Sequence, residues 1–356
     1  MSKTISFIVC SNGYGHLKRC LQVIDAFPIG YTINIFCKKH LLIYARNEIN
    51  FKKDIQVNFI SNCSENEFSW IEGKKVTWER YNNWKSTLAN SHELIESDLI
   101  ISDNHVLPMS LFDKVILMGS FLWHDVTLAS NKEVKEIIAY ERELLLSRTS
   151  SLVCLGDMFM PSLNNQVSLL KQGWFTQRSD LPYIGSSTKR ILITGGGTKL
   201  VNKQLLELVQ ILTEKHSQYE YLLDSKLFKV GQNLNSNFKL FSFSDEDFAS
   251  LDFVICRPGI GILTDCVRFS IPALVINDGF NLEINHNSKM VSELGIGIGI
   301  DVNGNNIQYA SKKISEAIHD KDFRLNCITQ LKNREVNGAV SAAEIIINFL
   351  ENGEYK

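Results

Sequence analysis

The chain has 356 residues, 44% of them hydrophobic, and 37 Lys and Arg against 39 Asp and Glu give a formal net charge of −2. These values are typical of a globular protein of about two domains, and they argue against a disordered chain or a large basic surface for nucleic acid. None of the eight cysteines forms a C-x-x-C pair, and no apolar run is long enough to span a bilayer. We therefore expect reduced thiols, no transmembrane segment and a cytoplasmic location.

Short apolar runs alternate with helical patterns along the first half of the chain. The predicted strands are Ile5–Cys10, Tyr31–Cys37, Ile55–Ile60, Asp98–Ser102, Lys114–Met118 and Ser151–Leu155. The predicted helices run from about His16 to Phe27, from the end of the strand Tyr31–Cys37 to about Asn47, from Val76 to Glu96 and from Lys132 to Ser147. A loop is predicted over Ser64–Lys75. This alternation predicts β-α-β units and a mostly parallel sheet.

The alternation lapses between Gly156 and Lys189 and then restarts. The later predicted strands are Arg190–Thr194, Tyr219–Leu223, Phe238–Phe241, Phe253–Cys256 and Ala273–Ile276, followed by consecutive helices over Ile307–Leu350. We expect an α/β protein with two Rossmann-like domains facing across a cleft, residues 1–185 and 186–356, with a last helix able to cross back to the first domain. In such sheets ligands bind outside the carboxyl ends of the strands.

A glycine-rich loop, Ser11–Gly15, follows the first strand and opens a helix at His16. Free N–H groups at a helix start favour an anion, and an imidazole there can act as a general base near pH 7. Asp103 ends a buried strand at the same sheet edge, from which it can orient that imidazole as the acid of a triad does. The alternatives are a helix-terminal histidine with one hydrogen bond and an aspartate that caps the next turn.

The second half carries three polar segments after predicted strands. Gly195–Gly197 with Thr198 suits a backbone anion site, without the G-K-[ST] ending of a Walker A loop. Arg257 and the helix start after Gly259 can hold a diphosphate, and Asp265 lies one turn into that helix, where it can accept from ribose hydroxyls. Glu283 and Asn287 are spaced i and i+4, which suits sugar hydroxyls, although a helix-start carboxylate with a solvated neighbour has the same spacing.

Two patterns imitate metal sites. Asp245-Glu246-Asp247 has the D-x-D form of another transferase class, but acids in the first turn of a short helix are expected from its dipole. The histidines show no ligand spacing such as H-E-x-x-H. We expect no metal and no cofactor.

Several of these motifs resemble nucleotide-sugar glycosyltransferases with the two-domain GT-B architecture. The nearest likeness is to the UDP-N-acetylglucosamine transferase of peptidoglycan synthesis and related glycosyltransferases. The resembling segments are Gly13–His16, Phe243–Phe248, Leu251–Gly259, Thr264–Asp265, Glu283–Asn287, Asn337–Ala339 and Ala342–Ala343. The likeness covers both halves and is most specific in the second.

The resemblance implies a role for each motif residue. His16 is the base and Asp103 its partner; donor-binding residues are Gly13, Gly15, Gly196, Gly197, Thr198, Arg257, Gly259, Gly261, Asp265, Glu283 and Asn287; acceptor candidates are Trp123 and His124. Arg257 and the glycines lie at the diphosphate, Asp265 at the ribose and Glu283 at the sugar. Asp265 is one methylene shorter than the family's Glu, and Ile284 replaces a frequent Gln. The aromatic loop around Trp123 faces the acceptor or packs as ordinary core.

The resulting expectation is an inverting, metal-independent glycosyltransferase that uses a nucleoside diphosphate sugar, with UDP favoured by the resemblance. A nucleotide-sugar hydrolase is the alternative, because Gly15–Leu21 resembles the UDP-sugar hydrolase of pseudaminic acid synthesis. A non-catalytic sugar-nucleotide binder is the third reading. The base and the sugar of the donor, the acceptor, whether water or an alcohol, and the oligomeric state stay open, as does peripheral membrane contact.

Overall fold

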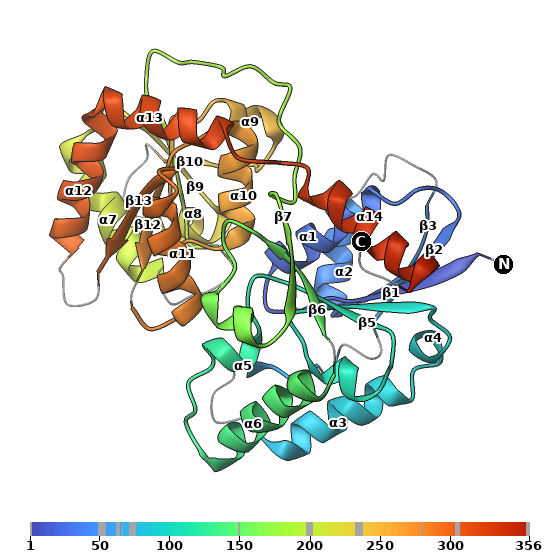
Figure 1. Ribbon diagram of the computed structural model, residues 1–356. Coiled ribbons are helices and arrows are strands. Elements are labelled where there is room, and N and C mark those ends of the chain that lie inside the picture. The colour runs from blue at the N-terminus through green and yellow to red at the C-terminus, as the bar shows by residue number, and fades with distance from the viewer. Residues whose placement is uncertain are drawn as a thin grey trace. The chain divides into compact units, whose positions relative to one another are not determined.

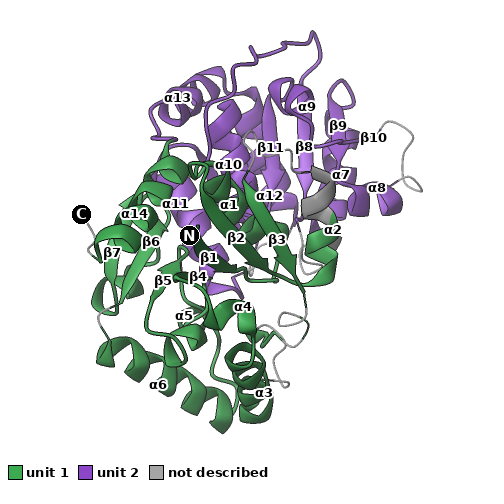
Figure 2. Ribbon diagram, turned by 90° about the vertical axis from the view of Figure 1, so that its right-hand side faces the viewer, with its two compact units in different colours: residues 1–175, 337–356 green, residues 176–336 purple. Residues whose placement is uncertain are grey.

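The computed structural model describes residues 2–48, 55–61, 65, 67–70, 76–148, 150–196, 202–231, 238–277, 279–302 and 307–353. The chain divides into two compact units (Figure 2): unit 1 is Met1–Phe175 with Asn337–Lys356, and unit 2 is Thr176–Val336. Each unit has its own parallel sheet and its own helices.

Unit 1 contains a seven-stranded sheet in the order β3-β2-β1-β4-β5-β6-β7. Its strands are β1 (Lys3–Ile8), β2 (Tyr31–Phe36), β3 (Gln56–Ile60), β4 (Leu99–Asp103), β5 (Val115–Met118), β6 (Ser151–Leu155) and β7 (Ser168–Gln172). Every residue of β4, β5 and β6 is buried. A parallel strand covered on both faces reads as a continuous apolar run, which is why the sequence reveals these three.

All but the last of the helices of unit 1 lie between these strands in the chain (Figure 1). They are α1 (Tyr14–Asp25), α2 (Lys39–Glu48), α3 (Trp78–Ala89), α4 (His92–Ile95), α5 (Trp123–Val126), α6 (Lys132–Ser147) and α14 (Gly338–Asn352), with 3-10 turns at Leu107–Ser110 and Pro161–Asn165. Side chains cap two of them: Thr77 accepts from Arg80 N, and Asn131 accepts from Val134 N. The single helix predicted over 76–96 divides at Asn90 and Ser91. The loop predicted over Ser64–Lys75 falls largely outside the described residues.

The helix α14 belongs to unit 1 although unit 2 precedes it in the chain. It packs against α1 and β7, so the red end of the chain lies beside the blue start in Figure 1. The approach at its first residue is close: a Cβ on Gly338 would lie 2.1 Å from the carbonyl oxygen of Gly173. At its other end, Lys3 Nζ donates to the Leu350 carbonyl at 3.1 Å.

Unit 2 contains a six-stranded parallel sheet in the order β10-β9-β8-β11-β12-β13. Its strands are β8 (Arg190–Thr194), β9 (Glu220–Leu223), β10 (Phe238–Leu240), β11 (Phe253–Cys256), β12 (Ala273–Asn277) and β13 (Gly297–Asp301). Its helices are α7 (Asn202–Lys215), α8 (Ser225–Gly231), α9 (Asp245–Ala249), α10 (Ile260–Phe269), α11 (Leu282–Glu293), α12 (Ile307–His319) and α13 (Lys321–Lys332). The strand order repeats that of the first six strands of unit 1, so two Rossmann-like sheets follow one another in the chain.

The units divide at 175/176, ten residues before the boundary expected at 185/186. The intervening segment is bonded to unit 2. Arg178 Nη2 donates to the Leu331 carbonyl at 2.6 Å, Ser179 N donates to Arg268 O at 3.2 Å, and Ile184 N donates to Ala249 O at 2.9 Å.

Two edge strands, β7 and β13, have no counterpart among the predicted strands. β7 has no fully buried residue, so its sequence lacks a strong apolar signal. β13 contains Gly297 and Gly299, which the strand pattern disfavours. A Cβ on Gly297 would lie 1.8 Å from the Ala273 carbonyl oxygen, so a close approach to β12 requires glycine there.

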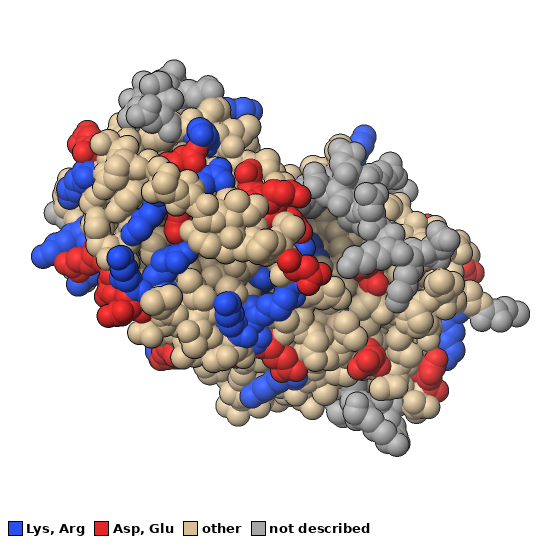
Figure 3. Space-filling view, turned by 90° about the horizontal axis from the view of Figure 1, so that it is seen from above, with Lys and Arg blue, Asp and Glu red and all other residues tan. Residues whose placement is uncertain are grey.

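The surface has mixed charge. On the face drawn in Figure 3, Lys and Arg side chains are interspersed with Asp and Glu side chains. Among the helices that the structure describes, none has the length and apolar character needed to cross a membrane.

Candidate functional site

Both sheets reverse their strand order at one point. In unit 1 the reversal lies between β1 and β4, and in unit 2 between β8 and β11. Ligands of open α/β sheets bind outside the carboxyl ends of the strands at such points. Each unit therefore has one place where its ligand-binding groups are expected, and we describe the two places separately.

In unit 1 this place holds His16 and Asp103. His16 lies in the first turn of α1, just after β1, and Asp103 is the last residue of β4. Parallel pairing of Ile8 with Ser102 brings these two strand ends together. His16 Nδ1 lies 2.8 Å from Asp103 Oδ2, and the exposed fractions of the two side chains are 16% and 1%. Within the part of the chain that the structure describes, the other ring nitrogen, Nε2, has no hydrogen-bond partner.

Arg19 completes this pair from the next turn of α1. Its Nη2 donates to Asp103 Oδ1 and also to Asn104 Oδ1 at 2.8 Å. Burial would raise the pKa of the Asp103 carboxyl, but the charge of Arg19 and the contacts with His16 outweigh it and lower the pKa to about 2. Asp103 is therefore an ionised acceptor for the Nδ1 proton of His16.

The loop after β5 covers the ring of His16. The ring centroids of Phe121 and Trp123 each lie 6.4 Å from the centroid of His16. Asn104 holds this loop, because its Nδ2 donates to the Phe121 carbonyl at 2.5 Å. Asn104 has a left-handed φ of 62°, and a Cβ on Gly119 would lie 2.6 Å from its Oδ1, so the contact requires glycine at 119.

A second polar cluster lies beside this pair. His105 Nε2 is 3.0 Å from Glu67 Oε1, which also accepts from Ser11 N at 2.9 Å. Cys10 Sγ lies within 4.8 Å of ligand atoms of Glu67 and His105, and also of His16 and Asp103, so either trio has the spacing of a metal site. Burial and the nearby carboxylates raise the pKa of the Cys10 thiol well above its usual value. That shift favours a neutral thiol over the thiolate that binds metals.

The acceptor candidates Trp123 and His124 are buried, with exposed fractions of 5% and 1%. Trp123 Nε1 donates to Cys10 Sγ at 3.3 Å. Both ring nitrogens of His124 are occupied, by Glu141 at 3.1 Å and by Gln166 at 2.8 Å. Burial alone would lower the pKa of His124, but Glu141 outweighs it and raises the pKa.

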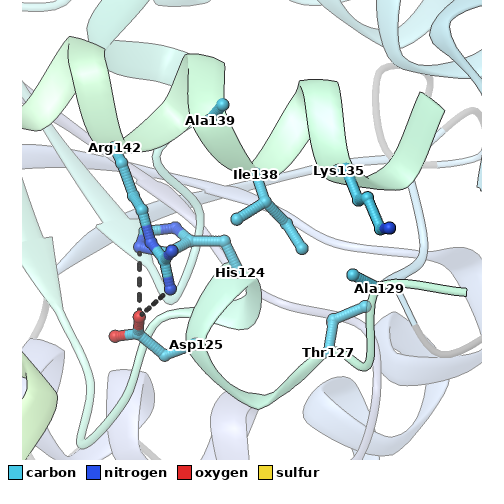
Figure 4. A pocket seen from close by; sticks show the side chains of 8 residues that line it. All are labelled: His124, Asp125, Thr127, Ala129, Lys135, Ile138, Ala139 and Arg142. Atoms are coloured by element: carbon cyan, nitrogen blue, oxygen red, sulfur yellow. Dashed lines mark hydrogen bonds and ion pairs between the residues drawn. The ribbon is translucent and has the colours of Figure 1, made fainter. Parts of the chain in front are cut away.

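His124 also borders an open hollow of about 330 Å³ in unit 1 (Figure 4). Its lining residues are His124, Asp125, Thr127, Ala129, Lys135, Ile138, Ala139 and Arg142. Dashed lines in Figure 4 join one carboxylate oxygen of Asp125 to the ring of His124, at 3.6 Å, and to the guanidinium of Arg142, at 3.4 Å. Both ring nitrogens of His124 are therefore bonded within the wall of this hollow, while Asp125 also pairs with Arg142.

In unit 2 the first strand end is the loop after β8. Gly196 has a left-handed φ of 67° and open space where a Cβ would be. Asp224, which follows β9, accepts from Thr194 Oγ1 at 2.8 Å and from Gly195 N at 3.1 Å, and so fixes the start of the loop. Gly197 and Thr198 lie outside the described residues.

The second strand end of unit 2 is the turn after β11, which carries Arg257. Gly259 is the N-cap residue of α10, and no side chain bonds the N–H groups at this helix start. The first turn contains Gly261 and no acidic residue. Asp265 lies farther along the same helix and is 7% exposed. Asn287 is 1% exposed, and its Nδ2 donates to the Pro258 carbonyl at 2.9 Å, so this amide group holds the turn that carries Arg257. Glu283 lies in the first turn of α11, beside the capping residue Asn281.

The D-E-D segment forms the first turn of α9. Asp245 pairs with Arg268 at 2.5 Å, and Asp247 accepts from Ser242 Oγ at 2.7 Å. Two of the three acids therefore stabilise the local fold.

The sequence motifs assign no role to three residues of the unit 1 site, Arg19, Asn104 and Glu67, although Arg19 lies within the Gly15–Leu21 segment. Arg19 is three residues after His16 in a helix, a spacing that places the two on one face. Asn104 directly follows Asp103. Glu67 lies in a segment without periodicity, and no signal in the sequence marks it.

Comparison with known proteins identifies the fold and a family model that matches part of the chain. Residues 190–344 match the glycosyltransferase family 28 C-terminal domain. No curated protein matches the sequence. Three solved structures share the fold: the glycotransferase of kitacinnamycin (TM-score 0.67, 12% identity, 98% of this chain and 100% of that chain); Phytolacca americana UGT2 complexed with UDP-2fluoro-glucose and pterostilbene (0.63, 11%, 97% and 95%); and Acinetobacter baumannii MurG (0.58, 12%, 97% and 99%). The expected GT-B fold of two parallel α/β sheets is confirmed.

The low pKa of Asp103 predicts a pH-dependent loss of stability. An unfolded aspartate has a pKa of about 3.9, so a folded pKa of about 2 means that the ionised carboxylate stabilises the protein above about pH 4 and loses that effect as the pH falls toward 2. We expect Asp103→Asn to lower the free energy of unfolding by about 2 kcal/mol at pH 7 and by about half as much near pH 3, where the native carboxylate has begun to lose its advantage. Urea unfolding at both values measures this, with the exposed Asp113→Asn as control. A difference that is equal at pH 3 and pH 7 contradicts it.

Proposed function

We propose that this chain is a glycosyltransferase that moves a sugar from a nucleoside diphosphate to an acceptor hydroxyl with His16 as the general base; the GT-B fold and the match of residues 190–344 to a family 28 C-terminal domain support this. The observation that carries the proposal is the His16–Asp103 pair at the strand reversal of unit 1. Asp103 takes one ring nitrogen, and the other has no partner within the described residues.

The proposed step is a single displacement. The proton on Nδ1 of His16 is donated in a hydrogen bond to Asp103, so Nε2 carries a lone pair. This lone pair takes up the hydroxyl proton of the sugar acceptor. The acceptor oxygen then forms a bond to the anomeric carbon as the bond to the diphosphate breaks, which inverts the configuration. The imidazolium formed is stabilised by Asp103. A general base of this kind contributes about 10²–10⁴-fold in rate.

The donor is proposed to bind at the strand ends of unit 2. The uncapped start of α10 and the positive charge of Arg257 are suited to a diphosphate, and they stabilise it electrostatically as it leaves. The open space at Gly196 and Gly259 allows close approach of phosphate oxygens to the backbone. Asp265 is proposed to bind the ribose and Glu283 the sugar. The donor-bound UGT2 structure supports a nucleotide sugar, with UDP as the first candidate.

Removing the base tests the proposal directly. A thermal-shift panel of UDP, dTDP and GDP, extended to sugar derivatives of the nucleotide that binds best, first selects the nucleotide sugar. His16→Ala is then expected to lower the rate of nucleoside diphosphate release about 10²-fold or more, because no side chain then takes up the proton of the acceptor hydroxyl. The affinity for the nucleoside diphosphate is expected to stay unchanged. His92→Ala, an exposed histidine of α4, is the control. Near wild-type turnover in folded His16→Ala would remove the base assignment.

The Arg257 turn predicts where donor affinity resides. Arg257→Ala is expected to weaken nucleoside diphosphate binding about tenfold to a hundredfold, since a hydrogen bond to a charged group contributes about 1.5–3 kcal/mol. Isothermal calorimetry measures the affinity. Arg268→Ala, in the last turn of the same helix, serves as the control. Equal affinities for Arg257→Ala and the wild type argue against the diphosphate role.

Metal independence is a separate prediction of the proposed charge stabilisation. If Arg257 and the start of α10 stabilise the negative charge of the leaving diphosphate, dialysis against EDTA leaves turnover unchanged, and added Mg²⁺ or Mn²⁺ does not raise turnover. The same nucleoside diphosphate release assay measures this. Activity that EDTA abolishes and Mn²⁺ restores would show that the reaction uses a metal.

A further inference from the structure

Arg19 has contacts that a general base and its acid partner alone do not require. It lies one turn after His16 on the same face of α1, and its side chain is 10% exposed. Its Nη2 bonds both Asp103 and Asn104 and lies 3.5 Å from His16 Nδ1. One guanidinium nitrogen therefore touches the base, its partner and the residue that follows the partner.

The charge of Arg19 fixes the state of Asp103. A neutral histidine supplies no charge to hold a buried carboxylate ionised, and burial favours the protonated acid. The nearby guanidinium of Arg19, which donates to Asp103 Oδ1, favours the ionised carboxylate and lowers the pKa of Asp103, so the carboxylate does not depend on a proton on His16 for its charge partner. An ionised Asp103 accepts only, which requires the proton of neutral His16 to lie on Nδ1 and leaves Nε2 free.

The same nitrogen also ties the aromatic loop to the pair. Asn104 accepts from Arg19 through Oδ1 and donates to the Phe121 carbonyl through Nδ2. Asn104 has the left-handed conformation, and Gly119 leaves room for its side chain. The position of Phe121 beside His16 thus depends on a chain of two hydrogen bonds that begins at Arg19.

We propose that Arg19 is a positioning residue, which through Asp103 and Asn104 holds His16 in the tautomer and orientation that transfer requires. This inference rests on the proposed function, because it takes His16 as the base. Arg19 touches neither donor nor acceptor in the proposal, so its effect is on turnover and not on nucleotide affinity.

The first experiment measures nucleoside diphosphate release from the selected nucleotide sugar, with water as the acceptor. Arg19→Met, which keeps the apolar stem, is expected to lower kcat about tenfold to a hundredfold with unchanged nucleoside diphosphate affinity. Arg19→Lys is expected to keep part of the wild-type kcat, because lysine supplies the positive charge but lacks the planar guanidinium with its several N–H donors. Arg148→Met is the control: this unit 1 arginine donates to the Phe112 carbonyl at 3.0 Å and is expected to keep wild-type kcat.

A double-mutant cycle separates positioning from general loss of structure. If Arg19 acts through the pair, Arg19→Met lowers kcat by less than about twofold further in the Asp103→Asn or His16→Ala background. An equal loss in all three backgrounds, or wild-type kcat in Arg19→Met, overturns the inference. Wild-type turnover in His16→Ala overturns the proposed base and, with it, this inference, whereas a loss in His16→Ala with none in Arg19→Met overturns the inference alone.

A readout without substrate follows the tautomer. In ¹⁵N spectra of the neutral ring, with the His16 signals assigned from the His16→Ala spectrum, the wild type is expected to carry its proton on Nδ1, and Arg19→Met to populate the Nε2–H form. If Arg19→Met does not fold, Arg19→Lys and Asn104→Gly, which keeps the left-handed backbone accessible, replace it. An unchanged Nδ1–H tautomer with unchanged kcat in these variants contradicts the inference.

Discussion

The carboxylate of Asp103 is the group on which the unit 1 site depends. It is 1% exposed, and it accepts from the Cys10 amide at 3.2 Å as well as from His16 and Arg19. A buried charge is tolerated only where donors and an opposite charge surround it. The end of β4 meets this condition because the segment after β1 supplies the Cys10 amide, and α1 supplies His16 and the guanidinium of Arg19.

The two units use one topology for two kinds of chemistry. Unit 1 places titratable side chains at its strand reversal, whereas unit 2 places an uncapped helix start and glycines with open space at the equivalent point. The first arrangement is suited to moving a proton and the second to holding an anion. Asp224 and Asn287 have a related task in unit 2, since both bind the backbone next to a strand end and keep it in place.

The fold could be predicted from the sequence wherever strands are buried on both faces, as in β4 and β11, because continuous apolar runs mark them. The edge strands β7 and β13 could not, since exposure in one and glycine in the other remove that pattern. The proximity of His16 to Asp103 could be predicted, because each residue lies at or just beyond the carboxyl end of a strand and parallel strands end at the same edge of the sheet. Arg19 could not be recognised in the same way, because a buried arginine and a solvated one look alike until the partner's burial is known. For the same reason Asn287 resembles a sugar ligand in sequence, while the structure gives its amide to Pro258.

The return of α14 to unit 1 has a consequence for how the protein is made. Residues 176–336 are synthesised after the seven strands of unit 1 and before the helix that covers α1 and β7. A ribosome therefore exposes a complete unit 2 while the first unit still lacks one of its packing helices. Unit 1, whose strands are translated first, is therefore completed after unit 2, and α1 gains α14 as a neighbour only after the whole of unit 2 has been synthesised.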